Sequence, residues 1–142
     1  HFSLWCMLAA PLILGNDIRK FIKEDGTIDT ESKIYSILTN KAMISINQDA
    51  LGVQCRRIKF GIVDILVKPL ENNKIAVCVF NKGNKKSDTV IDITELSNLG
   101  FVNLPQKSSY NVYDVWENEK IEQVNMINAA TEKHGVKVYI IE

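Results

Sequence analysis

Hydrophobic and polar residues follow two different patterns along the chain, and the change falls near Leu51 and Gly52. Before that point, apolar residues recur at helical spacing or stand in one continuous run. After it, short apolar stretches alternate with clusters of turn residues, which is typical of antiparallel strands. The pattern therefore predicts α/β elements first and an all-β region second.

The first stretch begins as a helix followed by a strand. Residues 1–10 are rich in helix formers, and Pro11 ends that helix. Leu12–Leu14 is a continuous apolar run closed by Gly15. Such a run suits a strand that is covered on both faces, as in a parallel sheet.

A second helix is expected to start at Asp29 or Thr30, either of which can cap it, and to end at Asn40. The residues at helical spacing on its apolar face are Ile34, Ile37 and Leu38. Ala42–Ile46 is a further apolar stretch that suits another short helix.

The second stretch reads as a series of strands. Phe60–Val67 alternates, with Asp64 on the polar face together with Lys68, whereas Ile75–Phe80 is apolar on both faces and suits a central strand between two layers. Further strand candidates are Thr89–Ile93, Tyr110–Trp116, Ile121–Ile127 and Val136–Ile141. The predicted turns are Asn72-Asn73, Asn81–Asn84, Glu117–Glu119 and His134-Gly135. Together they predict an antiparallel β-sandwich.

The two stretches differ in whether they can fold alone. Residues 55–142 can form a small sandwich, but residues 1–54 supply one strand and short helices that bury too little apolar surface. We therefore expect residues 1–54 to belong to a larger α/β body.

Composition excludes several classes of function. Lys plus Arg and Asp plus Glu both number 17, so no basic excess favours a nucleic-acid partner. The longest apolar run, Leu4–Leu14, is too short to cross a bilayer and contains Pro11. No charge block marks a membrane-surface patch, and no glycine-rich phosphate cradle occurs, so neither a membrane partner nor a cofactor is expected.

The cysteines do not form a metal-binding or redox motif. Cys6, Cys55 and Cys78 are odd in number and far apart, and neither His1 nor His134 lies near one of them. No zinc site is expected. Three buried free thiols are favoured, and a single disulfide stays open.

Several segments together carry a resemblance to glycoside hydrolase family 27, the family of α-galactosidases and α-N-acetylgalactosaminidases. His1–Trp5 and residues 10–19 (Ala-Pro-Leu-Ile-Leu-Gly-Asn-Asp-Ile-Arg) resemble the last helix–strand step of its barrel. Ile44–Gln54 (Ile-Ser-Ile-Asn-Gln-Asp-Ala-Leu-Gly-Val-Gln) is similar to the passage from the barrel to the C-terminal domain. Tyr113–Trp116 and His134–Val136 resemble short motifs of the terminal β-domain.

The resemblance implies a TIM (β/α)8 barrel followed by an antiparallel β-sandwich. Residues 1–54 would be the C-terminal end of the catalytic barrel, and residues 55–142 the sandwich. The full-length protein would be a retaining exo-glycosidase that hydrolyses terminal α-galactosides. In that reaction one Asp attacks the anomeric carbon and a second Asp protonates the leaving oxygen, with the carboxyl groups roughly 5–5.5 Å apart. Both family positions precede this chain, so no catalytic residue is assigned in it, and the chain alone is expected to be inactive.

Two residues are candidates for lying near the substrate. Asn16 and Asp17 follow the expected last barrel strand, where loops face the substrate. The structural role is favoured: Asp17 can cap the next turn or pair with Arg19. Asp49, at the domain junction, is expected to shape a turn through side-chain hydrogen bonds.

A second class of function stays open. The chain would then be a non-catalytic carbohydrate-binding or structural β-sandwich module, with Tyr110, Tyr113 and Trp116 as a sugar-stacking platform. In a small sandwich such aromatics more often belong to the core, which is the favoured interpretation here. The sequence does not identify the natural glycoside or show whether galactose or N-acetylgalactosamine is preferred. It also leaves open whether the protein forms a homo-oligomer and whether it is secreted or cytoplasmic.

Overall fold

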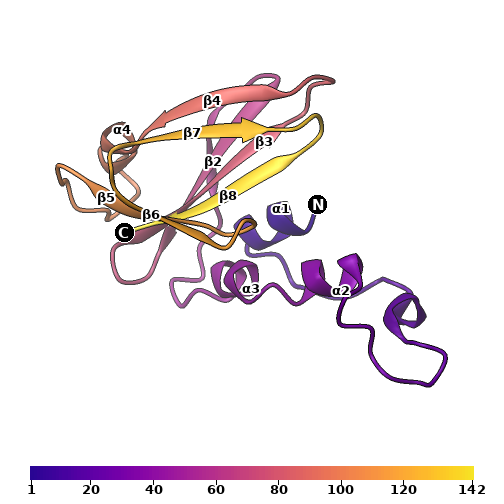
Figure 1. Ribbon diagram of the computed structural model, residues 1–142. Helices are drawn as coiled ribbons and strands as arrows, with labels where there is room; N and C mark the ends of the chain where they lie inside the picture. Colours follow the sequence, from indigo (N-terminus) through magenta and orange to yellow (C-terminus); the bar gives the residue numbers. More distant parts are fainter.

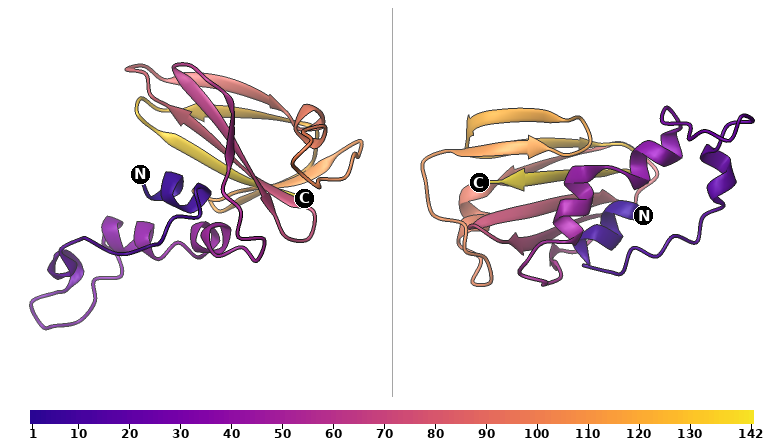
Figure 2. Two further views of the ribbon diagram at one scale, coloured as in Figure 1. Left: turned by 180° about the vertical axis from the view of Figure 1, so that it is seen from behind. Right: turned by 90° about the horizontal axis from the view of Figure 1, so that it is seen from below.

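A computed structural model describes all residues from His1 to Glu142. The strands form one body, and the N-terminal segment carries three short α-helices and a 3-10 helix, with part of the segment extending away from the strands (Figures 1 and 2). The helices are α1 (Phe2–Met7), the 3-10 helix η1 (Ile18–Phe21), α2 (Lys33–Leu38), α3 (Lys41–Asn47) and α4 (Ile93–Ser97). None of them combines the length and the hydropathy that a membrane span requires.

The strands form two sheets. They are β1 (Arg56–Lys59), β2 (Val63–Leu70), β3 (Lys74–Asn81), β4 (Ser87–Asp92), β5 (Tyr110–Asp114), β6 (Glu119–Val124), β7 (Met126–Thr131) and β8 (Val136–Ile141). The larger sheet has six strands in the order β1-β2-β3-β8-β5-β6, and β4 pairs with β7 in the smaller sheet. All pairs are antiparallel, so the predicted antiparallel sandwich is confirmed.

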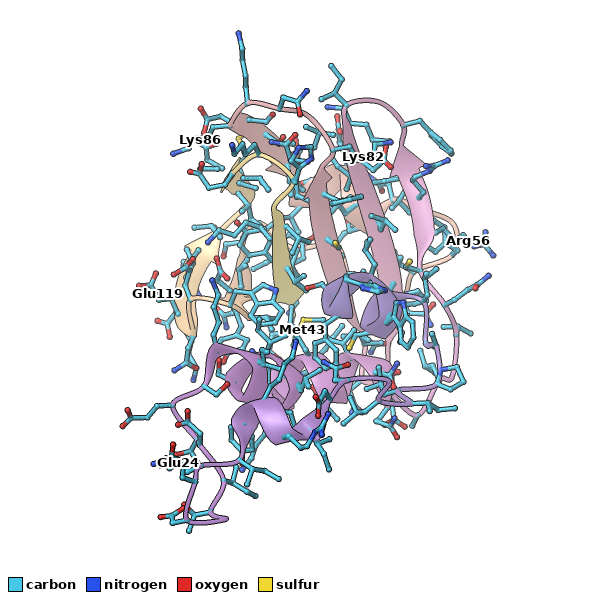
Figure 3. All side chains as sticks on the ribbon, turned by 90° about the vertical axis from the view of Figure 1, so that its right-hand side faces the viewer. Glu24, Met43, Arg56, Lys82, Lys86 and Glu119 are labelled. Atoms are coloured by element: carbon cyan, nitrogen blue, oxygen red, sulfur yellow. The ribbon has the colours of Figure 1, made fainter.

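The central strands of the large sheet are buried on both faces, whereas its edge strands β1 and β6 are mostly exposed. One face packs on β4 and β7, where Val77 and Ile127 belong to one hydrophobic cluster. The other face packs on α1 and α3, where Cys78 and Met43 belong to a second cluster. Met43 lies where the helices meet the sheet (Figure 3). The prediction that Ile75–Phe80 is a central strand between two layers is therefore confirmed.

The turn between β2 and β3 is the one that its sequence predicts. Asn72 and Asn73 have φ of 60° and 58°, a left-handed conformation that asparagine tolerates, and they lie in the loop 71–73 between the paired residues Leu70 and Lys74. His134 also has a positive φ of 54° and lies in the predicted turn before β8. Asn81, in contrast, ends β3, and the chain then crosses to β4 in the other sheet, so the predicted hairpin at Asn81–Asn84 is wrong.

Several strand predictions need correction in their extents. The strand predicted at Phe60–Val67 is Val63–Leu70, and the one predicted at Tyr110–Trp116 ends at Asp114. Ile121–Ile127 is two strands, because the chain leaves the large sheet after Val124 and enters the small one at Met126. Thr89–Ile93 ends one residue early, because the Asp92 carboxylate accepts hydrogen bonds from the amides of Thr94 and Glu95 and thereby caps α4.

The N-terminal helices also start elsewhere than predicted. α2 begins after Ser32, and the predicted cap Asp29 instead accepts a hydrogen bond from the amide of Glu31. Asn40, predicted as a helix end, caps the start of α3 through a 2.9 Å bond from the Met43 amide to its Oδ1. The short helix predicted at Ala42–Ile46 is confirmed as part of α3.

Candidate functional site

The N-terminal segment has one face fixed to the sandwich. Cys6 and Met7 of α1 are fully buried against the sheet and α3. The Cys55 amide donates a 2.9 Å bond to the carbonyl of Met7, and Trp116 Nε1 donates a 3.1 Å bond to Ser3 Oγ. Contacts from both parts of the chain therefore hold α1 in place across the sheet face (Figure 2).

A buried lysine joins the two helices to β2. Lys68 has no exposed surface, and its Nζ donates to the carbonyl oxygens of Cys6, at 3.3 Å, and Ile46, at 2.5 Å. These carbonyls lie near the C-terminal ends of α1 and α3, where helix dipoles favour a cation. Burial lowers the pKa of Lys68, and the negative charge of Asp49 opposes that shift. The sequence prediction placed Lys68 on the polar face of its strand, without the helices that cover it.

The opposite face of the segment is open. Leu12–Leu14 forms no strand, because no strand of this chain lies beside it. Ile13 and Leu14 are 78% and 53% exposed. With residues of α1 and α2 they line an N-terminal groove of about 530 Å³, whose apolar members include Trp5, Leu12, Ile13, Leu14, Ile34 and Ile37. A contiguous uncovered apolar surface of this kind marks an interaction site.

Of the two substrate-proximal candidates, Asn16 lies at this groove and Asp17 follows it in the chain. Asn16 is exposed and lines the groove. Asp17 accepts two 2.8 Å hydrogen bonds from the guanidinium of Arg19 and one of 3.1 Å from its amide, which also caps η1. These bonds hold the pKa of Asp17 below its ordinary value. An ion-paired carboxylate of lowered pKa is a poor proton donor, which favours the capping and pairing role.

The junction acid Asp49 shapes the passage between the two parts. Its carboxylate accepts hydrogen bonds from the amide of Leu51 at 3.1 Å and from the amide of Glu71, also at 3.1 Å. The predicted turn role of Asp49 is confirmed, and the bond to Glu71 adds a link to the β2–β3 hairpin that the sequence did not show.

Two acids of the sandwich, Asp64 and Asp114, are buried and hydrogen-bonded, although the sequence placed Asp64 on the polar face of its strand. Asp64 accepts bonds from Gly61 N at 3.0 Å, Lys82 Nζ at 2.9 Å and Arg57 Nη1 at 3.2 Å. Burial raises the pKa of Asp64, but these hydrogen bonds outweigh it, so the pKa lies below the ordinary value. Such a carboxylate is occupied by its structural partners.

Asp114 is satisfied in the same manner by the turn that follows β5. It accepts bonds from the amides of Trp116 at 3.0 Å and Glu117 at 3.1 Å, and from Lys137 Nζ at 3.2 Å. Lys137 also pairs with Glu117 at 2.6 Å. Neither Asp64 nor Asp114 has a second free carboxylate beside it for acid–base work.

The aromatic residues do not form an exposed platform. Tyr110 is buried, and its hydroxyl donates to the carbonyl of Pro105 at 3.1 Å. Trp116 is half-buried and bonded to Ser3. The core interpretation is confirmed for Tyr110, while Tyr113 is half-buried with its hydroxyl bonded to Asn118 at 2.6 Å.

The three cysteines are free and buried, as favoured from the sequence. Burial raises the pKa of Cys6 to about 11 and that of Cys78 to about 12, so both stay protonated near neutral pH. No group of three or more His, Cys, Asp or Glu side chains is arranged to hold a metal ion.

Comparison with known families decides what kind of chain this is. The model of the alpha galactosidase C-terminal beta sandwich domain matches residues 60–141. The chain belongs to this family. The matched domain and the relatives show that the chain is the C-terminal part of an alpha-galactosidase-type protein. They confirm the resemblance to glycoside hydrolase family 27. Asp64 and Asp114 both lie within the matched residues, whereas Arg57, one partner of Asp64, precedes them.

Relatives of this alpha galactosidase C-terminal domain extend the match to its N-terminal segment. The chain is 33% identical to an alpha-galactosidase of Coffea arabica, with 99% of the chain and 34% of the relative covered. It is 34% identical to alpha-galactosidase A of Cellvibrio japonicus, with 97% and 33% covered. The structure of alpha-galactosidase I from Mortierella vinacea is similar with a TM-score of 0.79 at 27% identity, covering 99% of this chain and 34% of that one. The chain thus spans about a third of the length of the curated relatives it matches.

Proposed function

We propose that this chain works as the C-terminal part of a retaining exo-glycosidase that hydrolyses terminal α-galactosides, with the catalytic aspartates upstream of His1. The substrate class is that named by the relatives, which are alpha-galactosidases. One upstream Asp would attack the anomeric carbon and another would protonate the leaving oxygen, then activate water for the second step. No residue of this chain takes either role.

The observation that carries the proposal is the N-terminal groove. Its apolar residues belong to a segment that matches alpha-galactosidases, yet nothing in this chain covers them. We propose that residues 1–54 complete a (β/α)8 barrel in which Leu12–Leu14 pairs with neighbouring strands. A barrel strand is buried between the interior and the outer helices, which matches the apolar character of this run.

The loop after that run would then face the substrate side of the barrel. Active sites of such barrels are built from loops at the C-terminal ends of the strands. Asn16 is exposed there and can reach a ligand, whereas Asp17 fixes the loop through Arg19. We therefore propose Asn16 as the more available of the two substrate-proximal candidates.

Hydrolysis of an aryl α-galactoside tests the proposal. The 142-residue chain alone should give no turnover, and a longer protein that includes the region before His1 should hydrolyse the α-anomer but not the β-anomer. Replacement of one upstream aspartate by asparagine is the control for contaminating activity. Turnover by the chain alone, or a longer protein that binds the substrate without cleaving it, would contradict the proposal.

A further inference from the structure

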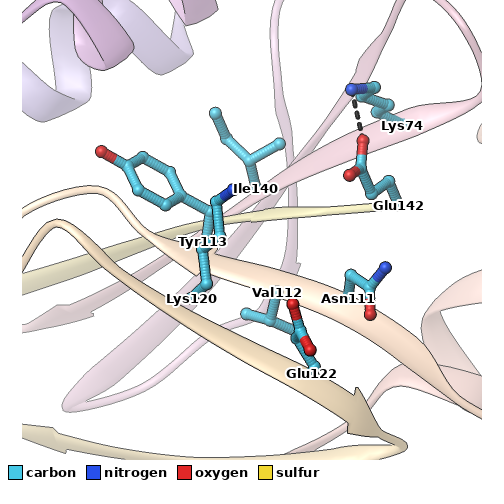
Figure 4. Close-up of a pocket in the computed structure, with 8 residues that line it drawn as sticks. All are labelled: Lys74, Asn111, Val112, Tyr113, Lys120, Glu122, Ile140 and Glu142. Atoms are coloured by element: carbon cyan, nitrogen blue, oxygen red, sulfur yellow. Dashed lines mark ion pairs between the residues drawn. The ribbon is translucent and has the colours of Figure 1, made fainter.

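A hollow of about 270 Å³ lies on the helix-facing side of the large sheet, away from the N-terminal groove. Four neighbouring strands supply its walls: β3 gives Lys74, β8 gives Ile140, β5 gives Asn111 and Tyr113, and β6 gives Lys120 and Glu122. Glu142, directly after β8, completes it (Figure 4). Because these side chains stand on paired strands, the backbone fixes their spacing in the absence of a ligand.

The charges around the hollow are balanced and interleaved. Lys74 forms an ion pair with Glu142, and Lys120 lies close to Glu122 along β6. The side chains of Asn111, Lys120 and Glu122 are exposed and form no hydrogen bond with the rest of the protein. Two ammonium groups and two carboxylates leave this hollow without a net charge, so charge alone does not attract an anionic or a cationic ligand to it. The hydrogen-bond donors and acceptors of Asn111, Lys120 and Glu122 therefore remain available to a ligand.

The apolar contacts of the hollow come from the half-buried Ile140 and the half-buried ring of Tyr113 at one side (Figure 4). The side chain of Val112 points the other way, into the core between the two sheets. Apolar contact together with a few directed polar groups is the usual composition of a small-molecule site. A sugar ring matches both parts, because it carries C–H faces and a rim of hydroxyls that each donate and accept.

The hollow continues past the end of the sheet. A second hollow of about 370 Å³ shares Lys74, Asn111 and Glu142 with the first, and its other lining groups include Asn73 and Lys107. The two hollows form a polar groove, defined here by Lys74, Asn111, Tyr113, Lys120, Glu122 and Glu142. Their combined extent suits several linked rings better than a single small molecule.

We propose that the polar groove is a non-catalytic binding site for a neutral oligosaccharide that carries α-galactosyl ends. The choice of galactosyl ends rests on the proposed function, whereas the saccharide class rests on the groove itself. Such a site would hold a branched substrate near the enzyme and raise its local concentration for the catalytic part.

Titration of the 142-residue chain with raffinose, an α-galactosyl trisaccharide, tests this inference by isothermal calorimetry and amide NMR shifts. We expect weak binding, on the order of 1 mM, with shifts centred on Asn111, Lys120 and Glu122. Glu122→Gln should weaken binding about tenfold, because a charged hydrogen-bond acceptor is lost. Glu119→Gln, the same substitution on the same strand outside both hollows, should leave it unchanged (Figure 3).

The outcomes separate this inference from the proposed function. Absence of binding, equal binding by Glu122→Gln, or equal binding of the glucose-only sugar maltotriose would overturn the inference, even if the longer protein hydrolyses α-galactosides. Raffinose binding at the groove by a protein whose longer form does not hydrolyse α-galactosides would leave the site standing and refute the proposed function. A folded Glu122→Gln chain, checked by its unchanged amide spectrum elsewhere, ensures that lost binding is local.

Discussion

The same kind of residue has opposite surroundings in the two parts of this chain. Ile75 on β3 is fully buried between two layers, while Ile13 in the N-terminal run is 78% exposed. The core of the sandwich is completed within the chain, although Phe60 and Ile62 between β1 and β2 are exposed, whereas the N-terminal segment buries only the face that meets the sandwich. A segment with one finished and one open apolar face indicates a core that is shared with further protein.

The largest expected difference between the two regions is the loss of folding stability when an isoleucine is replaced by alanine. Ile75→Ala should lower the free energy of unfolding by about 2–5 kcal/mol, because it opens a cavity in a packed core. Ile13→Ala should change it by less than about 0.5 kcal/mol in this chain, because its side chain already faces water. Urea denaturation monitored by circular dichroism measures both. Equal costs would show that the two regions are packed alike.

Removal of the Lys68 charge should loosen the attachment between the regions. Lys68→Met keeps most of the side-chain volume but leaves the carbonyls of Cys6 and Ile46 without their buried donor. We expect a loss of about 2 kcal/mol, together with faster amide exchange in α1 and α3. Lys59→Met, at an exposed position of the β1 edge, is the matched control and should be neutral within about 0.5 kcal/mol. An unchanged stability of Lys68→Met would refute the proposed attachment.

Low pH should reduce the folding stability of the sandwich, because it protonates Asp64. Its folded-state pKa lies below the unfolded value, so its contribution to stability is complete above about pH 4 and is lost as the pH falls through the folded pKa. Asp64→Asn should cost about 1–2 kcal/mol at pH 7 and flatten the fall in stability below about pH 4. Denaturation midpoints across that range measure the effect. A variant with the wild-type acid slope would mean that Asp64 is not responsible.

The smallest expected effect concerns the β2–β3 hairpin of the sandwich. Asn73 has a φ of 58°, so Asn73→Ala should cost about 1 kcal/mol, because alanine is strained in this conformation. Asn73→Gly should be neutral or slightly stabilising, since glycine adopts positive φ freely. Thermal unfolding of the two variants distinguishes them. A cost that is equal for both would point to a side-chain contact of Asn73 instead of its backbone conformation.

The sequence predicts the sandwich well because its signals are local. An apolar stretch on both faces identified β3, and the Asn-Asn pair identified its hairpin. The split of Ile121–Ile127 into two strands was missed, because a change of sheet leaves the alternation of residues largely intact. α4 had a usable signal, since Asp92 and Glu95 stand at the spacing of a capping pair.

The burial of Lys68 and Asp64 could not be predicted from the alternation of apolar and polar residues along β2. Alternation shows that two faces of a strand differ, but it does not show what covers the polar one. The cover of Lys68 comes from α1 and α3, far away in the sequence, and the partners of Asp64 come from β1 and the loop after β3. For the candidate site, the pairing of Asp17 with Arg19 was foreseen because it is local. The polar groove was not, because it is assembled from four strands.

Amide hydrogen exchange of Leu12–Leu14, compared between the 142-residue chain and a longer protein that includes the upstream region, tests the central claim most directly. The account predicts fast exchange in the chain alone, where these amides have no strand partner, and strong protection in the longer protein, where neighbouring strands would bind them. β3 should be protected in both. Equal and fast exchange at Leu12–Leu14 in the two proteins would contradict the claim that this segment completes a larger barrel.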